Sequence, residues 1–297
     1  MTRVVEPRFR PKSRRWPLMY AYLVECGGSS KTTSATSKAV IAAERGYPST
    51  IFDLDSNMST TKVLGYDETS LKGKKTVLDL IHCTASLDEV ALPARYRIAD
   101  GYGDEAFQTI PNLRVVPSCA AMSSADTAIT EDIDRYDWFA DVLRSYDGDD
   151  DMFFIDFPAG YGRMVYSVIR MLDEDDAVIP SVRADPKDIN MIPGLIQELE
   201  RVREKNRGRR SVPGRPTLKH MLLTGTPTAS YKEAAARRAT ELAEAKYGSV
   251  LLPYVRYSAD AKKLYEDACP LPVLLPNSVP AVDYRKVMTH LGFTGRT

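Results

Sequence analysis

Short apolar runs recur along the chain, and several of them end in a polar or acidic residue. We interpret these runs as buried strands, because they are rich in valine, isoleucine and leucine and lie between turn-forming residues. Most of the stretches between them carry apolar residues at helical spacing. Strands that alternate with helices predict an α/β fold, with a mostly parallel twisted sheet and helices on both faces. The predicted strands are 18–24, 49–55, 112–117, 152–156, 177–182, 218–224 and 250–255.

The predicted helices occupy the intervals between these strands. We find no internal repeat and no linker, so we expect residues 18–297 to form a single domain, which ends in one short helix and a polar tail within 283–297. In the interval 124–146, helical spacing places five apolar side chains on one face: Ile129, Ile133, Tyr136, Phe139 and Leu143. The predicted helices are 34–45, 76–82, 87–92, 124–146, 161–172, 186–204 and 230–247.

Residues 1–17 form a basic segment with three prolines, and we expect a flexible tail there. The alternative interpretation is an arm that binds DNA phosphates, because basic tails bind polyanions without sequence preference. The segment is too short to be a helix-turn-helix domain. Its basic residues are Arg3, Arg8, Arg10, Lys12, Arg14 and Arg15.

The overall charge does not select a class of partner. Forty basic residues balance forty acidic residues, so any attraction to nucleic acid must come from local patches. Four widely spaced cysteines without a C-x-x-C pair argue against a disulfide framework or a zinc site and fit a reducing cytosol. No apolar run is long enough to span a bilayer, and no signal-type region follows the basic start. We therefore expect a cytoplasmic protein that does not bind a membrane.

The segment from Glu25 to Thr33, with the sequence E-C-G-G-S-S-K-T-T, joins the first predicted strand to the first predicted helix. A glycine-containing turn followed by Lys-Thr at a helix start is typical of a loop that holds a triphosphate. The loop N–H groups point at phosphate oxygens, Lys31 adds a full charge, and the hydroxyl of Thr32 can ligate Mg²⁺. The strict pattern G-x-x-x-x-G-K-[ST] is not met, because Glu25 and Ser30 stand where it has glycines.

Two predicted strands end in acidic residues that could serve this loop. Asp55 ends the strand 49–55, about one strand-and-helix unit after Lys31. Asp156 ends the strand 152–156 and has the form of a Walker-B acid, whose carboxylate holds Mg²⁺, usually through water. Because strand ends form the sites of open α/β sheets, we expect both acids beside the phosphate loop. Asp53 is open to the simpler interpretation of an ordinary polar strand end.

Taken in order, these motifs resemble those of the ParA/MinD group of deviant-Walker ATPases, over roughly residues 18–292. The loop resembles the family's K-G-G-x-G-K-T-T, the strand 51–55 resembles I-D-x-D, and residues 154–160 resemble I-D-x-P-[PA]-[GS]. Further similar segments are the short helical pair within 76–90, the strand 112–118 and the late V-R…E-A…P-V segment within 255–273. The end of the chain lacks the basic amphipathic helix expected of MinD, so the resemblance is closest to ParA-type partition ATPases.

The resemblance implies an ATPase with ATP and Mg²⁺ as cofactors, which pairs face to face with a second copy around two nucleotides. It further implies that this ATP-dependent homodimer binds non-specific DNA and is associated with the nucleoid. A ParB-like or other cargo adaptor protein would stimulate hydrolysis. The implied role is to partition or position a plasmid, a chromosome or another cargo.

Site roles also follow from the resemblance, position by position. Lys31 and Asp55 would be catalytic, and Asp55 would orient the attacking water. Thr32 would ligate Mg²⁺, and Asp156, with Asp55 nearby, would hold the metal through water. The positions implied to bind the nucleotide are Gly27, Gly28, Ser29, Ser30, Lys31, Thr32 and Thr33.

Two loop positions depart from the family pattern. Cys26 replaces the family's first loop lysine, which supplies charge to the partner's site across the dimer. Arg163 and Lys187 are the candidates for a trans-acting base in its place, and each is also interpretable as a surface helix residue. Ser30 replaces a glycine: a positive φ there would be strained, whereas a negative φ would let its hydroxyl cap the helix.

Family position places the expected DNA contacts after the penultimate strand. The candidates are Arg256, Lys262 and Lys263, and we expect Lys232 and the basic loop 203–219 to join the same face. Each of these residues is also interpretable as part of a solvated basic helix face. Contacts to DNA phosphates predict an affinity that falls steeply with salt.

Other functions stay open on the sequence alone. Because Cys26 removes a charge, the alternative is a nucleotide-gated DNA-binding scaffold with negligible hydrolysis. A metabolic P-loop enzyme, or a nitrogenase-like iron–sulfur reductase, is a further class. The reductase requires a cluster cysteine just after the Walker-B acid, and residues 157–162 contain none.

Overall fold

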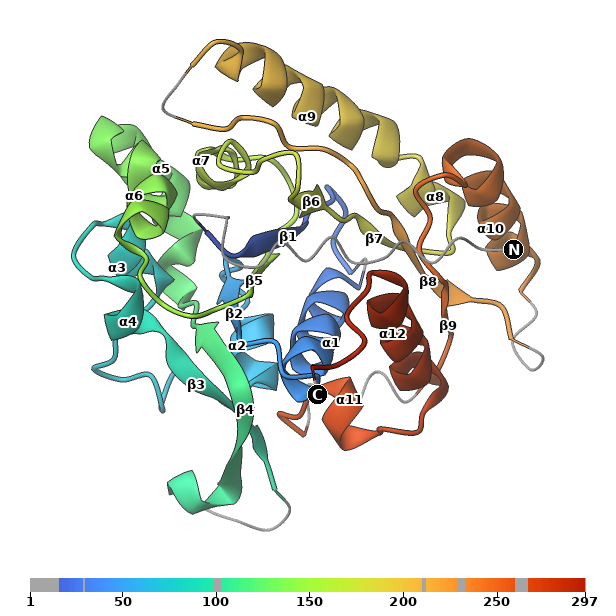
Figure 1. Ribbon diagram of the computed structural model, residues 1–297, viewed down its shortest axis with the longest axis horizontal. Coiled ribbons are helices and arrows are strands. Elements are labelled where there is room, and N and C mark those ends of the chain that lie inside the picture. The colour runs from blue at the N-terminus through green and yellow to red at the C-terminus, as the bar shows by residue number, and fades with distance from the viewer. Residues whose placement is uncertain are drawn as a thin grey trace.

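The computed structural model describes residues 16–28, 30–98, 103–209, 212–228, 233–259 and 267–296. Within them, strands form two sheets that are flanked by helices (Figure 1). The strands are β1 (Leu18–Tyr22), β2 (Ser49–Asp53), β3 (Leu92–Arg97), β4 (Phe107–Val116), β5 (Met152–Asp156), β6 (Ala177–Val178), β7 (Ser181–Arg183), β8 (Leu222–Thr226) and β9 (Val255–Arg256). The α-helices are α1 (Lys31–Glu44), α2 (Ser59–Val63), α3 (Val77–Ile81), α4 (Leu87–Val90), α5 (Ala125–Glu131), α6 (Trp138–Ser145), α7 (Arg163–Ile169), α8 (Pro186–Ile189), α9 (Ile192–Asn206), α10 (Ala234–Tyr247), α11 (Leu271–Leu274) and α12 (Val279–His290). Short 3-10 helices cover Gly103–Ala106, Ala120–Ser124 and Ile133–Asp137.

The larger sheet has six strands in the order β3-β4-β2-β5-β1-β6, and the smaller sheet has three in the order β7-β8-β9. Among the described pairs of named strands, only β3 and β4 run antiparallel. The predicted α/β fold with a mostly parallel sheet is therefore confirmed.

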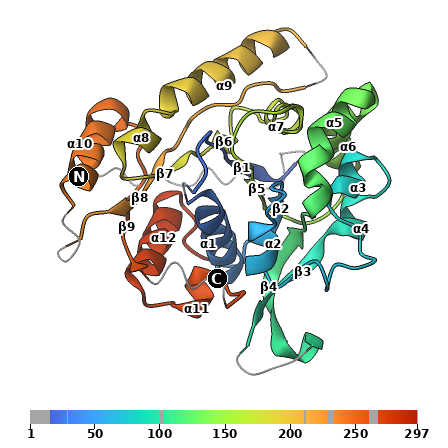
Figure 2. The same ribbon diagram turned by 180° about the vertical axis from the view of Figure 1, so that it is seen from behind.

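Helices cover both faces of the larger sheet. Along β5, Phe153 and Ile155 pack into one apolar core, whereas Met152 and Phe154 pack into the other. This alternation is the two-residue period of a strand, and β5 is buried on both sides. Figure 1 shows α1 and α12 together on one side of the sheet and α7 and α9 on the other, and Figure 2 shows the same arrangement from behind.

The register of β5 brings acidic strand ends together. Asp156 lies opposite Asp53 of β2 and opposite Tyr22 of β1. Because these strands are parallel, their carboxyl ends share one edge of the sheet. The turn that leads from β1 into α1 lies at this same edge, which is where open α/β sheets form their sites.

The prediction of one helix over 124–146 is wrong. The chain forms α5, a 3-10 turn and α6 instead, and Asp132 between them is extended, with φ −133° and ψ 107°. The Asp132 carboxylate accepts a hydrogen bond from the N–H of Asp134 at 3.1 Å. This local bond caps the new turn and competes with helix continuation.

Two further predicted elements are divided at prolines. The strand 177–182 becomes β6 and β7, which belong to different sheets, because Pro180 between them has no N–H to donate. Its carbonyl still accepts a hydrogen bond from Leu222 at 3.0 Å, so the two sheets stay close. The helix 186–204 becomes α8 and α9, and Pro193 stands in the first turn of α9, where proline favours a new helix start.

Several other boundaries differ from the predictions. The apolar pattern did not predict β3, α2 or α11. The helices α1 and α12 and the strand β4 begin three to five residues earlier than predicted, and β8, α10 and β9 begin four to five residues later. The ends of helices and strands are less predictable than their presence, because tertiary contacts help to decide them. That residues 18–297 form one domain stays a prediction, and residues 1–15 of the expected tail lie outside the described residues.

Candidate functional site

The loop between β1 and α1 exposes its glycines. Gly28 has φ +67°, and a Cβ atom added at Gly27 or Gly28 would meet no atom within 4 Å. The loop backbone is therefore open on the side of these glycines, as a surface that receives phosphate groups must be. Ser29 lies outside the described residues.

Ser30 is in the left-handed conformation, with φ 72°, and its side chain does not cap α1. This settles the two alternatives for Ser30 in favour of the strained one. Two contacts with the smaller sheet hold the residue: Thr224 donates a hydrogen bond to its Oγ at 3.1 Å, and Ser181 donates one to its carbonyl at 3.4 Å. The carbonyl of Ser30 also accepts the hydrogen bond of Ser34 in the first turn of α1.

Lys31 folds back over the loop. Its Nζ donates hydrogen bonds to the carbonyl of Cys26 at 2.9 Å and to that of Val24 at 3.4 Å. Burial lowers the pKa of Lys31, and the nearby Asp156 opposes this shift. The ammonium therefore lies within the loop, bonded to carbonyls that a phosphate group can replace.

Asp156 has one bonded and one unpartnered carboxylate oxygen. Oδ2 accepts hydrogen bonds from Thr32 at 2.7 Å and from Thr60 at 2.8 Å. Oδ1 is buried and has no hydrogen-bond partner among the described residues. Burial raises the pKa of Asp156 to about 6, against the hydrogen bonds from the two threonines. An unpartnered buried carboxylate oxygen is costly unless a cation or water binds it.

Asp53 is more than an ordinary polar strand end. It is fully buried beside Asp156, and burial together with the Asp156 charge raises its pKa to about 7. Its Oδ2 accepts hydrogen bonds from both the backbone N–H and the hydroxyl of Thr61. The sequence analysis missed Thr60 and Thr61, because nothing in their local sequence shows that α2 packs on these two acids.

Asp55 lies just beyond β2 and is partly exposed. Its Oδ1 accepts a hydrogen bond from Asn57 at 2.9 Å, and its carbonyl accepts one from Ser118 at 2.8 Å. Its charge contributes to the pKa shifts of both Lys31 and Asp156, after the larger effect of burial. The structure therefore brings together Lys31, Thr32, Asp55 and Asp156, as the sequence analysis expected.

These residues fit a nucleotide with Mg²⁺. Mg²⁺ prefers oxygen ligands and keeps several waters, so one hydroxyl, one carboxylate and the phosphates suffice. The hydroxyl of Thr32 and the free Oδ1 of Asp156 have the required chemistry. The described residues contain no group of three or more His, Cys, Asp or Glu side chains that would hold a metal by themselves.

The two candidates for a trans-acting base are exposed. Arg163 is the first residue of α7, and Lys187 lies in the short helix α8, where its backbone N–H donates to Asp185. Both helices follow strands at the edge that holds the loop. Among the described residues, no contact between either side chain and the loop distinguishes the two candidates from surface residues.

The proposed DNA contacts are only partly described. Arg256 forms a double ion pair with the buried Asp283, with both bonds at 2.8 Å, so its charge is largely matched within the chain. Lys232, Lys262 and Lys263 lie outside the described residues.

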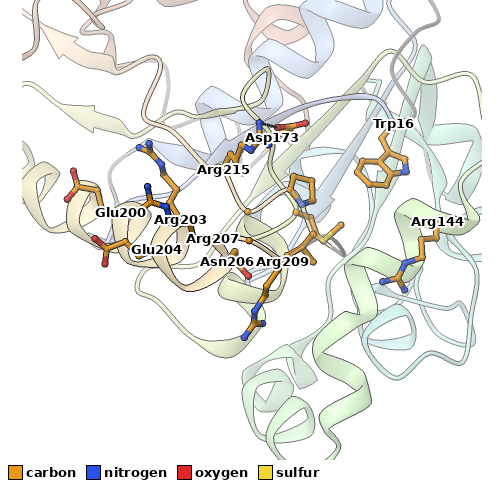
Figure 3. A pocket seen from close by; sticks show the side chains of 15 residues that line it. Trp16, Arg144, Asp173, Glu200, Arg203, Glu204, Asn206, Arg207, Arg209 and Arg215 are labelled. Carbon is orange, nitrogen blue, oxygen red and sulfur yellow. Dashed lines mark ion pairs between the residues drawn. The ribbon is translucent and has the colours of Figure 1, made fainter.

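The basic loop 203–219 does not lie with Arg256. It comprises the last turn of α9 and the chain that leads to the start of β8, at the amino ends of the strands, whereas Arg256 ends β9. A cavity of about 1100 Å³ opens here, and Figure 3 shows Arg203 and Arg209 near Arg207, with Trp16 and Arg144 across from them. The expectation of one shared basic face is therefore wrong, because the two groups lie at opposite edges of the fold (Figure 1).

Comparisons with known proteins agree with this geometry. A family model described as AAA domain matches residues 21–210. The cell division protein PomZ of Myxococcus xanthus (strain DK1622) is 25% identical over 271 residues, which cover 89% of this chain and 75% of PomZ.

Solved structures share the fold at lower identity. A complex of a McdA variant from Cyanothece with ATP has a TM-score of 0.70 at 17% identity and covers 95% of this chain and 98% of its own. Cobyrinic acid a,c-diamide synthase from Mycobacterium smegmatis, with a bound ATP analog and magnesium, has a TM-score of 0.68 at 18% identity, covering 91% and 92%. In the part of the chain that the structure describes, no helix has the length and apolar character to cross a membrane.

Proposed function

The chain belongs to the AAA domain family and is a P-loop ATPase of the ParA/MinD group, and from this premise we propose that it binds ATP with Mg²⁺ and hydrolyses it. One observation carries the proposal. The buried Asp156 at the end of β5 bonds Thr32 through one oxygen and leaves the other free, beside Lys31 at the start of α1. This arrangement supplies a metal-holding carboxylate, a hydroxyl ligand and a phosphate-binding ammonium within one edge of the sheet.

Each of these side chains has a definite task in this proposal. Lys31 exchanges the carbonyl of Cys26 for a phosphate oxygen, and the loop N–H groups hold the remaining phosphates. Thr32 and Asp156 would hold Mg²⁺, which would neutralise charge that develops on the phosphates. Asp55 orients the attacking water from the rim of the site. The chemistry is thus mainly positioning and charge stabilisation.

The relatives support a proposal about the cellular role. PomZ is named as a cell division protein, and we propose that this chain positions or partitions a cargo. In this proposal two ATP-bound copies pair, bind non-specific DNA of the nucleoid, and meet a cargo adaptor that stimulates hydrolysis. A DNA gel shift with and without ATP, at rising salt, tests the DNA step. ATP-dependent binding that falls steeply with salt supports it, and an affinity that does not respond to salt contradicts it.

Cys26 favours a second candidate, a nucleotide-gated DNA-binding scaffold with negligible hydrolysis. A loop lysine at this position would add a charge that the described loop lacks. The ATPase and the scaffold differ in their turnover of ATP and not in their binding of ATP.

The deciding experiment measures ATP binding and ATP turnover on the same preparations. ATP with Mg²⁺ at a hundred times its Kd raises the unfolding free energy by about 2.7 kcal/mol, and Lys31→Ala abolishes this gain. Steady-state turnover with DNA and adaptor present that is lost in Asp55→Ala, but kept in the exposed control Asp149→Ala, supports the ATPase. Binding without any turnover supports the scaffold, and no binding by the wild type contradicts both.

A further inference from the structure

Strand β7 begins against the phosphate loop. The hydroxyl of Ser181 lies 2.6 Å from that of Ser34 and 3.4 Å from the carbonyl of Ser30. Side chains of a strand alternate between faces, so Arg183 projects from the same face as Ser181, about 7 Å further toward the carboxyl end. That direction leads to the carboxyl ends of the strands, the edge that also holds the phosphate loop. Figure 1 and Figure 2 both show β7 beside the start of α1.

Asp188 fixes the direction of the Arg183 side chain. Its Oδ2 accepts a hydrogen bond from Nε at 3.1 Å, and its Oδ1 accepts one from Nη2 at 3.4 Å. Asp188 is 1% exposed, whereas the Arg183 side chain is 51% exposed. Of the five N–H donors of a guanidinium group, Asp188 takes two, so three remain for a ligand. An arginine oriented in this way is suited to bind phosphate oxygens in pairs.

Cys26 packs against the apolar cluster that includes Val182 and Ala184, the neighbours of Arg183, and its carbonyl accepts a hydrogen bond from Lys31. The hydrogen bonds that Arg183 donates to Asp188 raise the pKa of Arg183 most, and Cys26 contributes a smaller increase. The same thiol opposes the burial-induced fall in the pKa of Lys31. Arg183 and Lys31 therefore both lie near the loop at Cys26. Among the described contacts, none links Arg163 or Lys187 to the loop at Cys26.

We propose that Arg183 is the second cation of the nucleotide site, which binds the polyphosphate of ATP, and that Asp188 is its positioning residue. This inference rests on the proposed binding of ATP. It assigns the charge that the loop lacks at Cys26 to a residue of the same subunit, on the neighbouring sheet.

The single variant Arg183→Ala does not test phosphate binding by Arg183 cleanly. Arg183→Ala alone leaves the buried Asp188 carboxylate without its partner, and this charge would repel phosphate whatever the role of Arg183. The double variant Arg183→Ala/Asp188→Asn removes both charges together. Arg215→Ala is the matched control, because Arg215 is also an exposed arginine in an ion pair, with Glu174 at 2.9 Å, at the other edge of the fold.

The measurement is the Kd of ATP and of ADP, each with Mg²⁺, by titration calorimetry on the full chain. We expect the double variant to bind ATP about tenfold more weakly or worse, since it loses charge-assisted hydrogen bonds to the phosphates. The loss for ADP is smaller, because ADP carries less charge, and a purely structural defect would not separate the two nucleotides. Arg183→Lys keeps the charge without the fork and recovers part of the affinity.

The outcomes separate the two proposals. Wild-type ATP affinity in the double variant, with the wild type and Arg215→Ala binding normally, overturns the role of Arg183 and leaves the proposed ATPase intact. An equal loss for ATP and ADP with a lowered unfolding temperature also overturns it, because it indicates a structural effect. Failure of the wild type to bind ATP overturns both.

Discussion

At the scale of single residues, the site depends on two buried carboxylates that carry raised pKa values. Burial raises the pKa of Asp156 to about 6 and that of Asp53 to about 7. A protonated Asp156 cannot attract Mg²⁺, so binding of the metal must displace its proton. With Asp156 in its proposed role, the site should hold a cation near neutral pH and lose it in mild acid.

The affinity for ATP with Mg²⁺ consequently falls as the pH drops through about 6, where Asp156 gains its proton. The affinity measured in EDTA should change much less over the same range, because it does not require the carboxylate. Titrations at pH values on both sides of this pKa check the prediction. Asp156→Asn should remove the difference between the two pH profiles, and a difference that persists in this variant contradicts it.

Lys38 presents the opposite case, a buried cation that the proposed chemistry does not use. Its Nζ has no hydrogen-bond partner among the described residues and lies 4.6 Å from the ring centroid of Tyr22. Burial lowers the pKa of Lys38 to about 7 from 10.5. Because the unfolded chain binds this proton more tightly, the charge destabilises the fold below a pH of about 10.5, and fully below about 7.

Lys38→Met should therefore raise the free energy of unfolding, by roughly 2 kcal/mol or more at neutral pH. The gain should shrink as the pH rises from about 7 to 10.5, where the unfolded lysine loses its charge as well. Urea unfolding of the wild type and of Lys38→Met at several pH values measures this gain in the free energy of unfolding. Lys246→Met, at an exposed position on α10, is the control and should show no such pH-dependent gain.

The sequence predicted the site residues that belong to continuous motifs, and it missed those that tertiary packing supplies. Lys31, Thr32 and Asp156 stand in a recognisable order of strand, loop and helix. Thr60 and Asp188 are ordinary polar residues in their local sequence, and they reach the site only because α2 and α8 pack at this edge. A single sequence carries no signal for such contacts, because they depend on strand order and register.

At the scale of elements, α7 depends on a close approach between Gly162 and α5. The carboxylate of Asp126 on α5 accepts a hydrogen bond from the N–H of Met164 at 2.8 Å, in the first turn of α7. A Cβ atom at Gly162 would overlap the carboxylate of Asp126. The glycine therefore allows Asp126 to satisfy the start of the helix that follows the Asp156 strand.

Gly162→Ala should destabilise the fold by about 1–3 kcal/mol, because the added methyl group displaces Asp126 from the helix end. Gly194→Ala is the matched control on α9, where a Cβ atom meets nothing within 4 Å. This change should stabilise the protein by up to about 1 kcal/mol, through helix propensity alone. Thermal unfolding of the two variants checks the opposite signs, and equal effects would contradict the contact with Asp126.

Two breaks that the apolar pattern did not predict are each marked by a proline in the sequence. Pro180 and Pro193 have a simple steric and hydrogen-bonding reason to interrupt a strand or a helix, so these breaks could be predicted from the prolines. Asp132 is different, because an aspartate occurs in many continuous helices. Its extended backbone results from the local bond to Asp134 together with the packing around α5, which periodicity alone does not reveal.

At the scale of the whole molecule, one left-handed residue of the phosphate loop bonds to both β7 and β8 of the smaller sheet. Ser30 belongs to the loop of the larger sheet, and its hydroxyl and carbonyl are bonded to Thr224 of β8 and Ser181 of β7. Any ligand that fixes the loop therefore also fixes these two strands. Within the described residues, the basic cavity at the opposite edge has no such connection to the loop.

The hydrogen bonds of Ser30 connect the phosphate loop to β7 and β8, and they should couple the motions of the loop and of these strands. Occupation of the loop should slow amide hydrogen exchange not only in the first turn of α1 but also in β7 and β8. Ser30→Gly keeps the left-handed backbone at no steric cost and removes the hydroxyl, so it should preserve protection of α1 and weaken that of β8. If β8 is protected equally in the wild type and in this variant, the hydroxyl of Ser30 does not transmit the effect of the ligand to β8. If they differ, the hydroxyl of Ser30 couples the motion of the phosphate loop to that of β8.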